Sequence, residues 1–371
     1  MRQILKGKIN RYSQAEVAEF IETTSPTITR FLNGKQETSL YTSLKLISYL
    51  APKEEKKMML ELIKEIEKPS NVIIALEYCS TNRLVKTMNY LLKKFKDTSN
   101  HELKEYLSVY ELIYKWQMRH EGISVEQLMS KARALKVTTK EGNVLIKLLE
   151  VYVYFNEEKY HLAYDLANDL QSLTQDLDIQ YLKNSINARI AETKAFLALN
   201  LINDVEQAKQ CATYVIKSKI GRSFSAFAHF VLGEAQRYSD FEMSKLHFGK
   251  ALKCYSKYSS LNAEETRKEI EHLSAIHGKE YAYQNAICKA MYLYNNKNQS
   301  EAVELLNNTK PSTAMEMMFV GQIQQDEQML MQALTKFVQE KDMFNAKHVK
   351  KLLKEHESNT AMLDNLMNIF A

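Results

Sequence analysis

The sequence contains little of the two residues that end helices. Nine Gly and four Pro occur among 371 residues, well below the usual share of about 12% for the pair. Because Gly and Pro break helices and build tight turns, their scarcity favours long helices joined by short connections. Runs of alternating apolar and polar residues between turn dipeptides, which would indicate strands, are also missing. The sequence therefore predicts an all-α fold.

Cysteines and long apolar segments are similarly scarce. The four cysteines lie far apart without a C-x-x-C pair, a spacing that suits neither a zinc site nor disulfides and fits reduced thiols in a cytosol. No apolar run reaches the roughly 18 residues of a transmembrane helix. The charged residues 1–10 lack the apolar core of a signal peptide. We expect a cytoplasmic protein with no membrane partner.

Patterns typical of enzymes are missing as well. The glycines form neither a G-x-G-x-x-G nor a Walker motif, and no serine lies in a G-x-S-x-G sequence. His272 and His277 do not have the H-E-x-x-H spacing of zinc proteases. We predict no catalytic site, no metal and no cofactor.

Positive charge is concentrated at the N-terminal end. The net charge is +5, and residues 1–53 hold eight Lys and Arg against four Glu, so the remaining residues are close to neutral. This asymmetry is typical of a nucleic-acid-binding head on a neutral body. We assign residues 1–52 to a DNA-binding domain and residues 53–70 to a linker helix.

Residues 13–34 (SQAEVAEFIETTSPTITRFLNG) have the pattern of two short helices. Ser13 and Glu16 predict a capping box at the start of the first helix. Pro26 suits the first turn of the second helix, and Gly34 suits its end.

The spacing within this segment resembles the Cro/repressor-like helix-turn-helix family. When Gln14 is counted as the first position, Ala18 is the small residue at the fifth, where the two helices cross. Ile28 is the packing residue at the fifteenth position. Glu22 occupies the ninth position, which is often Gly in that family, so we expect a looser or longer turn.

The side chains at the start of the second helix are the candidates for reading DNA. Such a helix lies in the major groove, where Arg30 can form a bidentate contact with guanine. Gln14 and the helix N-termini are expected to contact phosphates, and the partner is double-stranded promoter DNA. The predicted DNA-binding residues are Arg11, Gln14, Ser25, Pro26, Thr27, Thr29, Arg30 and Lys35.

Residues 71–361 form a succession of amphipathic helices with a recurring pattern. Segments 145–170, 225–252, 286–306 and 315–337 combine small residues with aromatic and alanine positions. They resemble degenerate tetratricopeptide repeats, whose period is about 34 residues. Stacked repeats form a right-handed superhelix whose concave surface suits an extended peptide or serves as a scaffold for a protein partner. The pattern leaves both uses open.

The C-terminal residues 362–371 carry one apolar helical face. This face is either a capping helix over the last repeat or a dimer contact, and a head that reads a two-fold operator would favour a dimer. The candidate dimer contacts are Leu363, Leu366, Met367 and Phe370.

Several longer segments resemble a family of phage regulators. They are IALEYCSTNRL (74–84), VTTKEGNVLIKLLEVYVYF (137–155), RSFSAFAHFVLGEAQRYSDFEMSKLHFGKAL (222–252) and MMFVGQIQQDEQMLMQALTKFVQEKD (317–342). Behind a helix-turn-helix, they resemble the peptide-sensing regulators of Gram-positive bacteria and their phages, above all the arbitrium receptors of Bacillus phages. The resemblance implies a homodimer in the host bacterial cytoplasm that binds promoter DNA and activates transcription until a short secreted peptide binds. It would thereby control the choice between lysis and lysogeny.

The same resemblance implies a peptide pocket. Asp342 falls where the family has an acidic partner for a basic peptide side chain, and Arg222 where it has a basic pocket residue. Glu234 stands where the family has a pocket asparagine. The implied peptide-binding residues are Asn200, Arg222, Glu234, Asn295, Asn296 and Asp342.

Three functions fit these features. The leading hypothesis is a transcription regulator gated by a peptide, which either breaks the dimer or fixes the heads at an unsuitable spacing. The first alternative is a helix-turn-helix regulator whose repeat domain binds a protein partner and no peptide. The second is an interaction scaffold or response-regulator antagonist without sequence-specific DNA binding.

Overall fold

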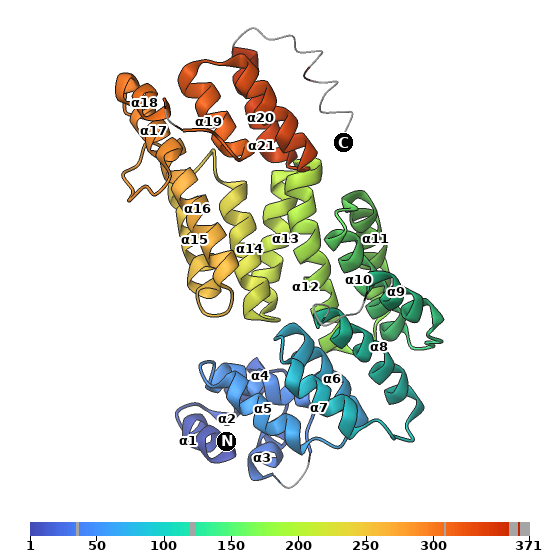
Figure 1. The fold of residues 1–371 in the computed structure, drawn as a ribbon. Coiled ribbons are helices and arrows are strands. Elements are labelled where there is room, and N and C mark those ends of the chain that lie inside the picture. Colours follow the sequence, from blue (N-terminus) through green and yellow to red (C-terminus); the bar gives the residue numbers. More distant parts are fainter. Residues whose placement is uncertain (35–36, 119–123, 308, 356–362, 364–371) are drawn as a thin grey trace. The chain divides into compact units, whose positions relative to one another are not determined.

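The computed structural model describes residues 1–34, 37–118, 124–307, 309–355 and 363 of the chain. Within these residues the regular secondary structure consists of helices, with no strand (Figure 1). The predicted all-α fold is therefore confirmed.

Contacts between helices divide the chain into two compact units. The first contains Met1–Val153 and Asp169–Asn187, and the second contains Tyr154–Asn168 and Ala188–Ala371. The predicted domain limits at residues 52, 70 and 361 stay a prediction. The divisions between the units fall within three helices, α10 (Lys140–Asn156), α11 (Tyr160–Leu173) and α12 (Gln180–Leu197).

The first unit begins with the helices of the predicted head. The helix assigned as a linker, α5, packs against α4 and buries four apolar side chains of its own. The core of the head contains Leu5, Val17, Ile28, Phe31 and Ile47, each at most 4% exposed. The helices are α1 (Arg2–Ile9), α2 (Gln14–Phe20), α3 (Ser25–Asn33), α4 (Leu40–Leu50) and α5 (Glu55–Glu65).

The head is joined to the following helix by a buried asparagine. The Asn71 side chain accepts a hydrogen bond from the Leu40 backbone N–H at 2.7 Å and donates to Glu37 Oε1 at 2.6 Å. These bonds hold the segment before α4 against α6, so packing fixes the position of the head within the first unit. The other helices of this unit are α6 (Pro69–Thr81), α7 (Val85–Lys94), α8 (His101–Gln117), α9 (Val125–Ala134) and η2 (Thr174–Asp176).

A recurring glutamate caps the start of a later helix. In each case one carboxylate oxygen accepts hydrogen bonds from two consecutive backbone N–H groups that immediately precede that helix. These N–H groups have no partner within the helix, and a negative charge there is favoured by the helix dipole. The pairings are Glu37 with Glu67 and Lys68, Glu105 with Thr138 and Thr139, Glu141 with Asp178 and Ile179, and Glu271 with Gln284 and Asn285.

The second unit is a series of helices in which each packs against the next, as the predicted repeats require. Figure 1 shows α13 to α16 side by side in this arrangement. The predicted repeat segments 225–252, 286–306 and 315–337 correspond to the pairs α14–α15, α17–α18 and α19–α20. The helices are η3 (Ala198–Ile202, a π-helical turn), α13 (Val205–Ser218), α14 (Arg222–Ala235), α15 (Phe241–Tyr255), α16 (Ser260–Ile276), α17 (Ala286–Asn295), α18 (Gln299–Leu306), α19 (Ala314–Gln324), α20 (Glu327–Gln339) and α21 (Met343–Glu355).

A glycine permits the close approach of α14 and α15. A Cβ atom at Gly233 would lie 2.7 Å from the ring of Phe248, which is fully buried. Replacing Gly233 with Ala is therefore expected to lower the free energy of unfolding by about 1–3 kcal/mol, because the ring must leave its packed position. Urea unfolding followed by circular dichroism measures this change.

Gly249 of α15 provides the matched control for that substitution. A Cβ atom there would meet nothing within 4 Å, so Gly249→Ala is expected to raise stability by up to about 1 kcal/mol through helix propensity. Equal effects of the two substitutions would show that contact with Phe248 does not limit the residue at position 233.

The remaining expectations concern the cysteines, metal ligands, membrane helices and the C-terminal residues. Cys79, Cys211, Cys254 and Cys288 are free thiols. Among the described residues, no group of three or more His, Cys, Asp or Glu could hold a metal ion, and no helix is long and apolar enough to cross a membrane. Leu363 is buried in a hydrophobic cluster of the second unit, whereas Leu366, Met367 and Phe370 lie outside the described residues.

Candidate DNA-binding surface and buried charge cluster

The two helices of the predicted helix-turn-helix begin and end at the expected residues. Ser13 and Glu16 form the capping box of α2, and Ser25 begins α3 with Pro26 in its first turn. Gly34 ends α3 in the left-handed conformation, with φ of 66°. The local sequence signals at these termini are confirmed because each one satisfies free backbone groups of its own helix.

The turn between α2 and α3 differs from the expectation in one respect. Glu22 adopts the left-handed backbone conformation usually taken by glycine, with φ of 55°, and the Thr23 N–H donates to the Ala18 carbonyl at 2.8 Å. Only residues 21–24 separate the two helices, which is a normal length for this motif. The expectation of a looser or longer turn is therefore wrong. Glu22 Oε2 instead forms an ion pair with Lys45 Nζ at 2.6 Å.

Gln14 connects the starts of the two helices. Its Nε2 donates to the Ser25 carbonyl at 3.1 Å and to Thr29 Oγ1 at 2.8 Å. Thr27 Oγ1 is 2.9 Å from Thr24 Oγ1. These bonds order several of the predicted DNA-binding side chains before DNA arrives, while Pro26 remains exposed.

The basic residues of the head fall into two groups. The first group is neutralised, because Arg2, Lys8 and Lys45 form ion pairs with glutamates. Arg11 and Arg30 are exposed, and neither makes a hydrogen bond or ion pair with any residue that the structure describes. Their charges are therefore available to phosphate oxygens or base edges. Lys35, also predicted to contact DNA, lies outside the described residues.

Arg30 is the side chain with the sharpest expected effect on DNA recognition. Replacing it with Ala should weaken specific binding by roughly 1–3 kcal/mol and relax the preference at one base position. Anisotropy titrations with duplexes carrying single base substitutions measure both quantities. Arg11→Ala is the comparison, because loss of a phosphate contact should weaken all sequences alike and reduce the salt slope by about 1. Unchanged affinity and base preference in Arg30→Ala would contradict the assignment.

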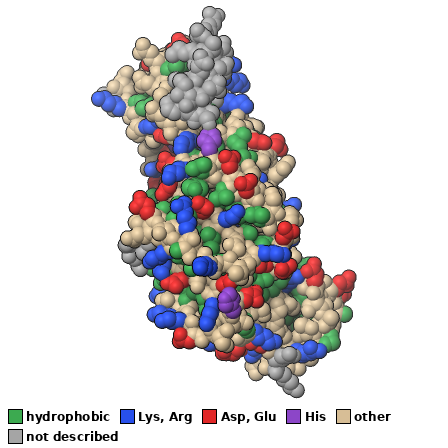
Figure 2. Space-filling view, turned by 90° about the vertical axis from the view of Figure 1, so that its right-hand side faces the viewer, with side chains coloured by type: hydrophobic (Ala, Val, Ile, Leu, Met, Phe, Trp, Pro, Cys, Tyr) green, Lys and Arg blue, Asp and Glu red, His purple; other side chains and the backbone are tan. Residues whose placement is uncertain are grey.

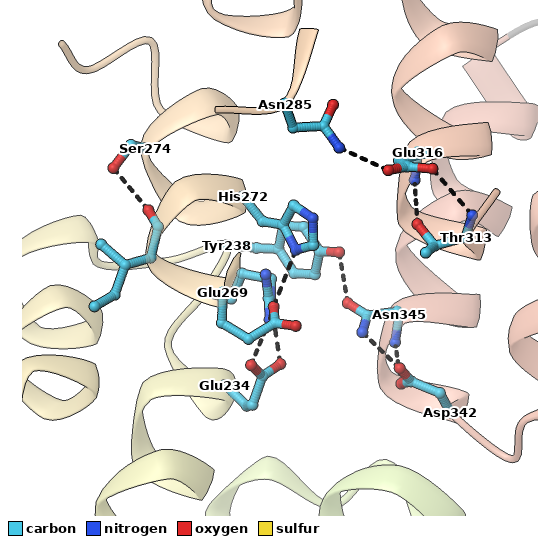
Figure 3. Close-up of polar contacts among 12 residues, drawn as sticks. Glu234, Tyr238, Glu269, His272, Ser274, Asn285, Thr313, Glu316, Asp342 and Asn345 are labelled. Carbon is cyan, nitrogen blue, oxygen red and sulfur yellow. Dashed lines mark hydrogen bonds and ion pairs between the residues drawn. The ribbon is translucent and has the colours of Figure 1, made fainter. Parts of the chain in front are cut away.

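A buried arginine organises a charge cluster in the second unit. Arg237, which follows α14, is 1% exposed. Its Nε donates to Glu234 Oε2 at 3.1 Å, and its Nη2 bridges Glu234 of α14 and Glu269 of α16. Figure 3 shows Glu234 and Glu269 facing one another, with His272 beside them. His272 Nδ1 lies 3.2 Å from Glu269 Oε2.

The cluster contains more acid than base. Glu234, Glu269 and Asp342 interact electrostatically with the single guanidinium of Arg237. Burial, reinforced by the nearby Glu269 and opposed by Arg237, raises the pKa of Glu234 to about 7. Burial also raises the pKa of Asp342, against the hydrogen bonds from Asn345. Burial also opposes ionisation of Glu269, but Arg237 and His272 outweigh it and lower the pKa of that carboxyl. A cation placed beside a buried carboxyl with a raised pKa would stabilise its charged form in the same way.

The six predicted peptide-binding residues occupy different surroundings. Glu234 and Asp342 lie in the charge cluster. Arg222 is exposed at the start of α14 and makes no hydrogen bond or ion pair with a described residue. The remaining three bond to main-chain carbonyls, Asn200 to Phe196, Asn295 to Ala275 and Ile276, and Asn296 to Gly278 and Tyr292.

A surface pocket has a volume of about 450 Å³. Some of its lining residues directly follow two of the predicted peptide-binding residues in the sequence. Asn200 directly precedes the pocket residues of η3, and Asp342 directly precedes those of α21. The pocket is lined by apolar and basic side chains, which suits a ligand that has apolar groups and an anionic group. Its lining residues are His161, Leu201, Ile202, Asn203, Met343, Lys347 and Lys350.

Four residues of the cluster were not identified from the sequence. Arg237 had a local signal, since it lies three residues after Glu234, the spacing of helical side-chain pairs. Asn345 had the same local signal, since it lies three residues after Asp342. Glu269 and Tyr238 had none, because their contacts join distant parts of the chain. The Tyr238 contact with Asn345, for example, spans 107 residues.

Comparison with known proteins gives matches over most of the chain. A family model described as AimR transcriptional regulator-like matches residues 55–355. The AimR transcriptional regulator of Bacillus phage SPbeta and the SPbeta prophage-derived uncharacterized protein YopK of Bacillus subtilis (strain 168) are each 22% identical to it over 227 residues. These alignments cover 60% of this chain and 57% of the length of either relative.

Solved structures have the same fold. SeMet-phAimR superposes with a TM-score of 0.81 and 20% identity over 99% of both chains. The structure named phAimR-Ligand superposes with a TM-score of 0.64 and 21% identity over 87% of this chain and 98% of that one. The family model covers more than half of the sequence and describes transcriptional regulators rather than a class of enzymes. The chain therefore belongs to the AimR transcriptional regulator-like family.

Proposed function

We propose that this protein is a DNA-binding transcription regulator whose activity is switched by a short signalling peptide bound in the second unit. It acts as a homodimer in the cytoplasm of a host bacterium and controls the choice between lysis and lysogeny of a phage. The proposal rests on two observations. The helix-turn-helix has arginines without a partner among the described residues. The repeat unit has a buried acidic cluster whose Asp342 directly precedes Met343, a residue that lines a pocket with basic side chains.

The DNA-binding part of the proposal rests on the head. Arg11 and Arg30 are exposed and unpaired among the described residues, and Gln14 orders the start of α3. Basic and acidic side chains are interspersed on the face of the molecule in Figure 2. This mixture agrees with a body close to neutral, so electrostatic attraction of DNA would come mainly from the head.

The peptide-binding part rests on the charge pattern of the second unit. Asp342 supplies a carboxylate, while Lys347 and Lys350 line the pocket that begins at the next residue. A short peptide carries both signs of charge and apolar side chains, so it matches acidic, basic and apolar groups that lie close together. The buried Nη1 of Arg237 has no hydrogen-bond acceptor among the described residues, and a peptide carbonyl would provide one.

The decisive experiment measures DNA binding with and without peptide. Labelled DNA from the region upstream of the gene is titrated with the protein, and a synthetic peptide encoded nearby is added at saturation. We expect salt-sensitive binding whose Kd rises roughly 5–150-fold with the peptide. A scrambled peptide should change nothing. Asp342→Asn, which can still cap α21 but lacks the charge, should weaken the peptide effect.

Two other results would support the alternatives. Specific DNA binding that ignores the peptide would favour a regulator whose repeat unit binds a protein partner. No specific DNA binding at all would favour an interaction scaffold. Light scattering of the free and peptide-bound protein would then show whether the dimer dissociates or persists.

A further inference from the structure

A short chain of hydrogen bonds leads from the end of α14 to the start of α21. Tyr238 Oη donates to Asn345 Oδ1 at 2.6 Å, and Asn345 Nδ2 donates to Asp342 Oδ2 at 2.6 Å. The Asn345 backbone N–H donates to Asp342 Oδ1 at 3.0 Å. Figure 3 shows Tyr238, Asn345 and Asp342 linked in this order by dashed lines.

The members of this chain are held by their surroundings. Asn345 is 4% exposed. The Tyr238 ring is stacked on His348, with 3.7 Å between ring centroids and 10° between the planes. A tyrosine held in this way presents its hydroxyl in one direction, so the Asn345 amide and the Asp342 carboxylate are oriented in turn.

Asp342 differs from the other two carboxylates of the cluster in its partners. Glu234 and Glu269 both bond to the guanidinium of Arg237. Asp342 accepts bonds only from the neutral groups of Asn345 and forms no ion pair with a described residue. An ionised carboxylate has about four lone-pair sites, so each oxygen of Asp342 keeps one site for a further donor. Two parallel donors of a guanidinium would match this arrangement.

We propose that Tyr238 and Asn345 are positioning residues that orient the Asp342 carboxylate toward a guanidinium or ammonium group of the bound peptide. This inference rests on the proposed function. Tyr238 does not touch the ligand in this scheme. Its hydroxyl acts through Asn345, which fixes the plane of the carboxylate and thereby favours a planar, two-donor cation over a neutral group of the same shape.

The test compares two forms of the peptide encoded beside the gene. One form has arginine at the basic position of the peptide, and in the other citrulline replaces that arginine, which removes the charge and keeps the shape. Isothermal titration gives the ratio of the two Kd values for the wild type, Tyr238→Phe and Asp342→Asn. Tyr164→Phe is the matched control, because it removes a hydroxyl that bonds to Gln207 elsewhere in the same unit at 2.9 Å.

The wild type is expected to prefer the arginine peptide by roughly tenfold or more, as a charge-assisted contact to a carboxylate requires. Tyr238→Phe should reduce this preference severalfold without changing the Kd of the citrulline peptide, and Asp342→Asn should abolish it. Tyr164→Phe should retain it. A merely structural role of Tyr238 would weaken both peptides alike.

Other outcomes overturn different parts of the argument. If the wild type and Tyr238→Phe show the same preference, the positioning role is wrong and the proposed function stands. Binding of a peptide that contains neither arginine nor lysine would also overturn the positioning role. If the wild type binds no encoded peptide at all, both the proposed function and this role are wrong.

Discussion

Replacing Arg237 with Met is expected to lower the free energy of unfolding by about 3–5 kcal/mol. The substitution keeps much of the side-chain volume but removes the guanidinium that bridges Glu234 and Glu269. Both carboxylates would then be buried without the cation that compensates them. Urea unfolding of the full chain followed by circular dichroism measures the loss.

A triple variant distinguishes uncompensated buried charge from a packing defect as the cause of that loss in stability. Arg237→Met combined with Glu234→Gln and Glu269→Gln removes all three charges, and we expect it to recover most of the lost stability. Arg267→Met is the control for a surface pair, since Arg267 and Glu264 are 3.2 Å apart with side chains 52% and 58% exposed. It should change stability by less than about 1 kcal/mol. A triple variant as unstable as the single one would contradict the electrostatic explanation.

The pH dependence of Arg237→Met gives a second test. Without the guanidinium, burial raises the pKa of both carboxyls in the folded state above their unfolded values. A raised folded pKa contributes stability that is present below the unfolded pKa and lost as pH rises through the folded pKa. The deficit relative to the wild type should therefore be largest near pH 8 and shrink toward pH 4.5. A deficit independent of pH would indicate lost packing alone.

The second large effect is expected for Glu105 of the first unit. Its side chain is 7% exposed, and its carboxylate accepts bonds from the backbone N–H groups of Thr138 and Thr139, each at 2.9 Å, and from the Thr138 hydroxyl at 2.7 Å. Burial opposes ionisation, but these bonds outweigh it and lower the pKa of Glu105 to about 2. Glu105→Gln should therefore cost on the order of 3 kcal/mol at neutral pH.

The pH dependence of this effect has the opposite sign to that of Arg237→Met. A lowered folded pKa contributes stability above the unfolded pKa, which is lost as pH falls through the folded pKa. The difference between wild type and Glu105→Gln should thus be constant above pH 5 and disappear between about pH 4.5 and 2. Fluorescence of the only tryptophan, Trp116, reports unfolding in the same helix, α8.

A glutamate of the same helix serves as the control for Glu105. Glu111 is exposed and pairs with Lys115 at the surface. Glu111→Gln should change the free energy of unfolding by less than about 1 kcal/mol at any pH. If Glu105→Gln behaves like Glu111→Gln, the recurring glutamate caps would not contribute to the stability of the unit.

Much of the local architecture could be predicted from the sequence. Ser13 with Glu16, and Gly34, indicated helix ends because a cap involves groups only a few residues apart. The scarcity of Gly and Pro indicated the helical class, because each of these residues disrupts a helix through its own backbone. The repeat segments 225–252, 286–306 and 315–337 could also be predicted, since the two helices of one repeat are joined by a short turn.

The sites depended on contacts that short patterns do not encode. Glu234 and Asp342 were predicted from family resemblance, but Glu269, which shares Arg237 with Glu234, and Tyr238, which reaches Asp342 through Asn345, come from distant parts of the chain. Glu22 occupies the position that is often Gly in helix-turn-helix proteins and adopts the left-handed conformation there with φ of 55°, although its residue type gives no sign of that conformation.

The sequence by itself determined the helical class, the helix ends and the repeat pairs, because these depend on interactions between near neighbours. Only the tertiary structure decided which arginines of the head remain unpaired and which carboxylates surround Arg237. The physical reason is that burial and ion pairing depend on what a folded chain brings together. The pKa of a carboxyl such as Asp342 therefore depends on its burial and on the distant Arg237 and Glu269 as well as on Asn345 of its own segment.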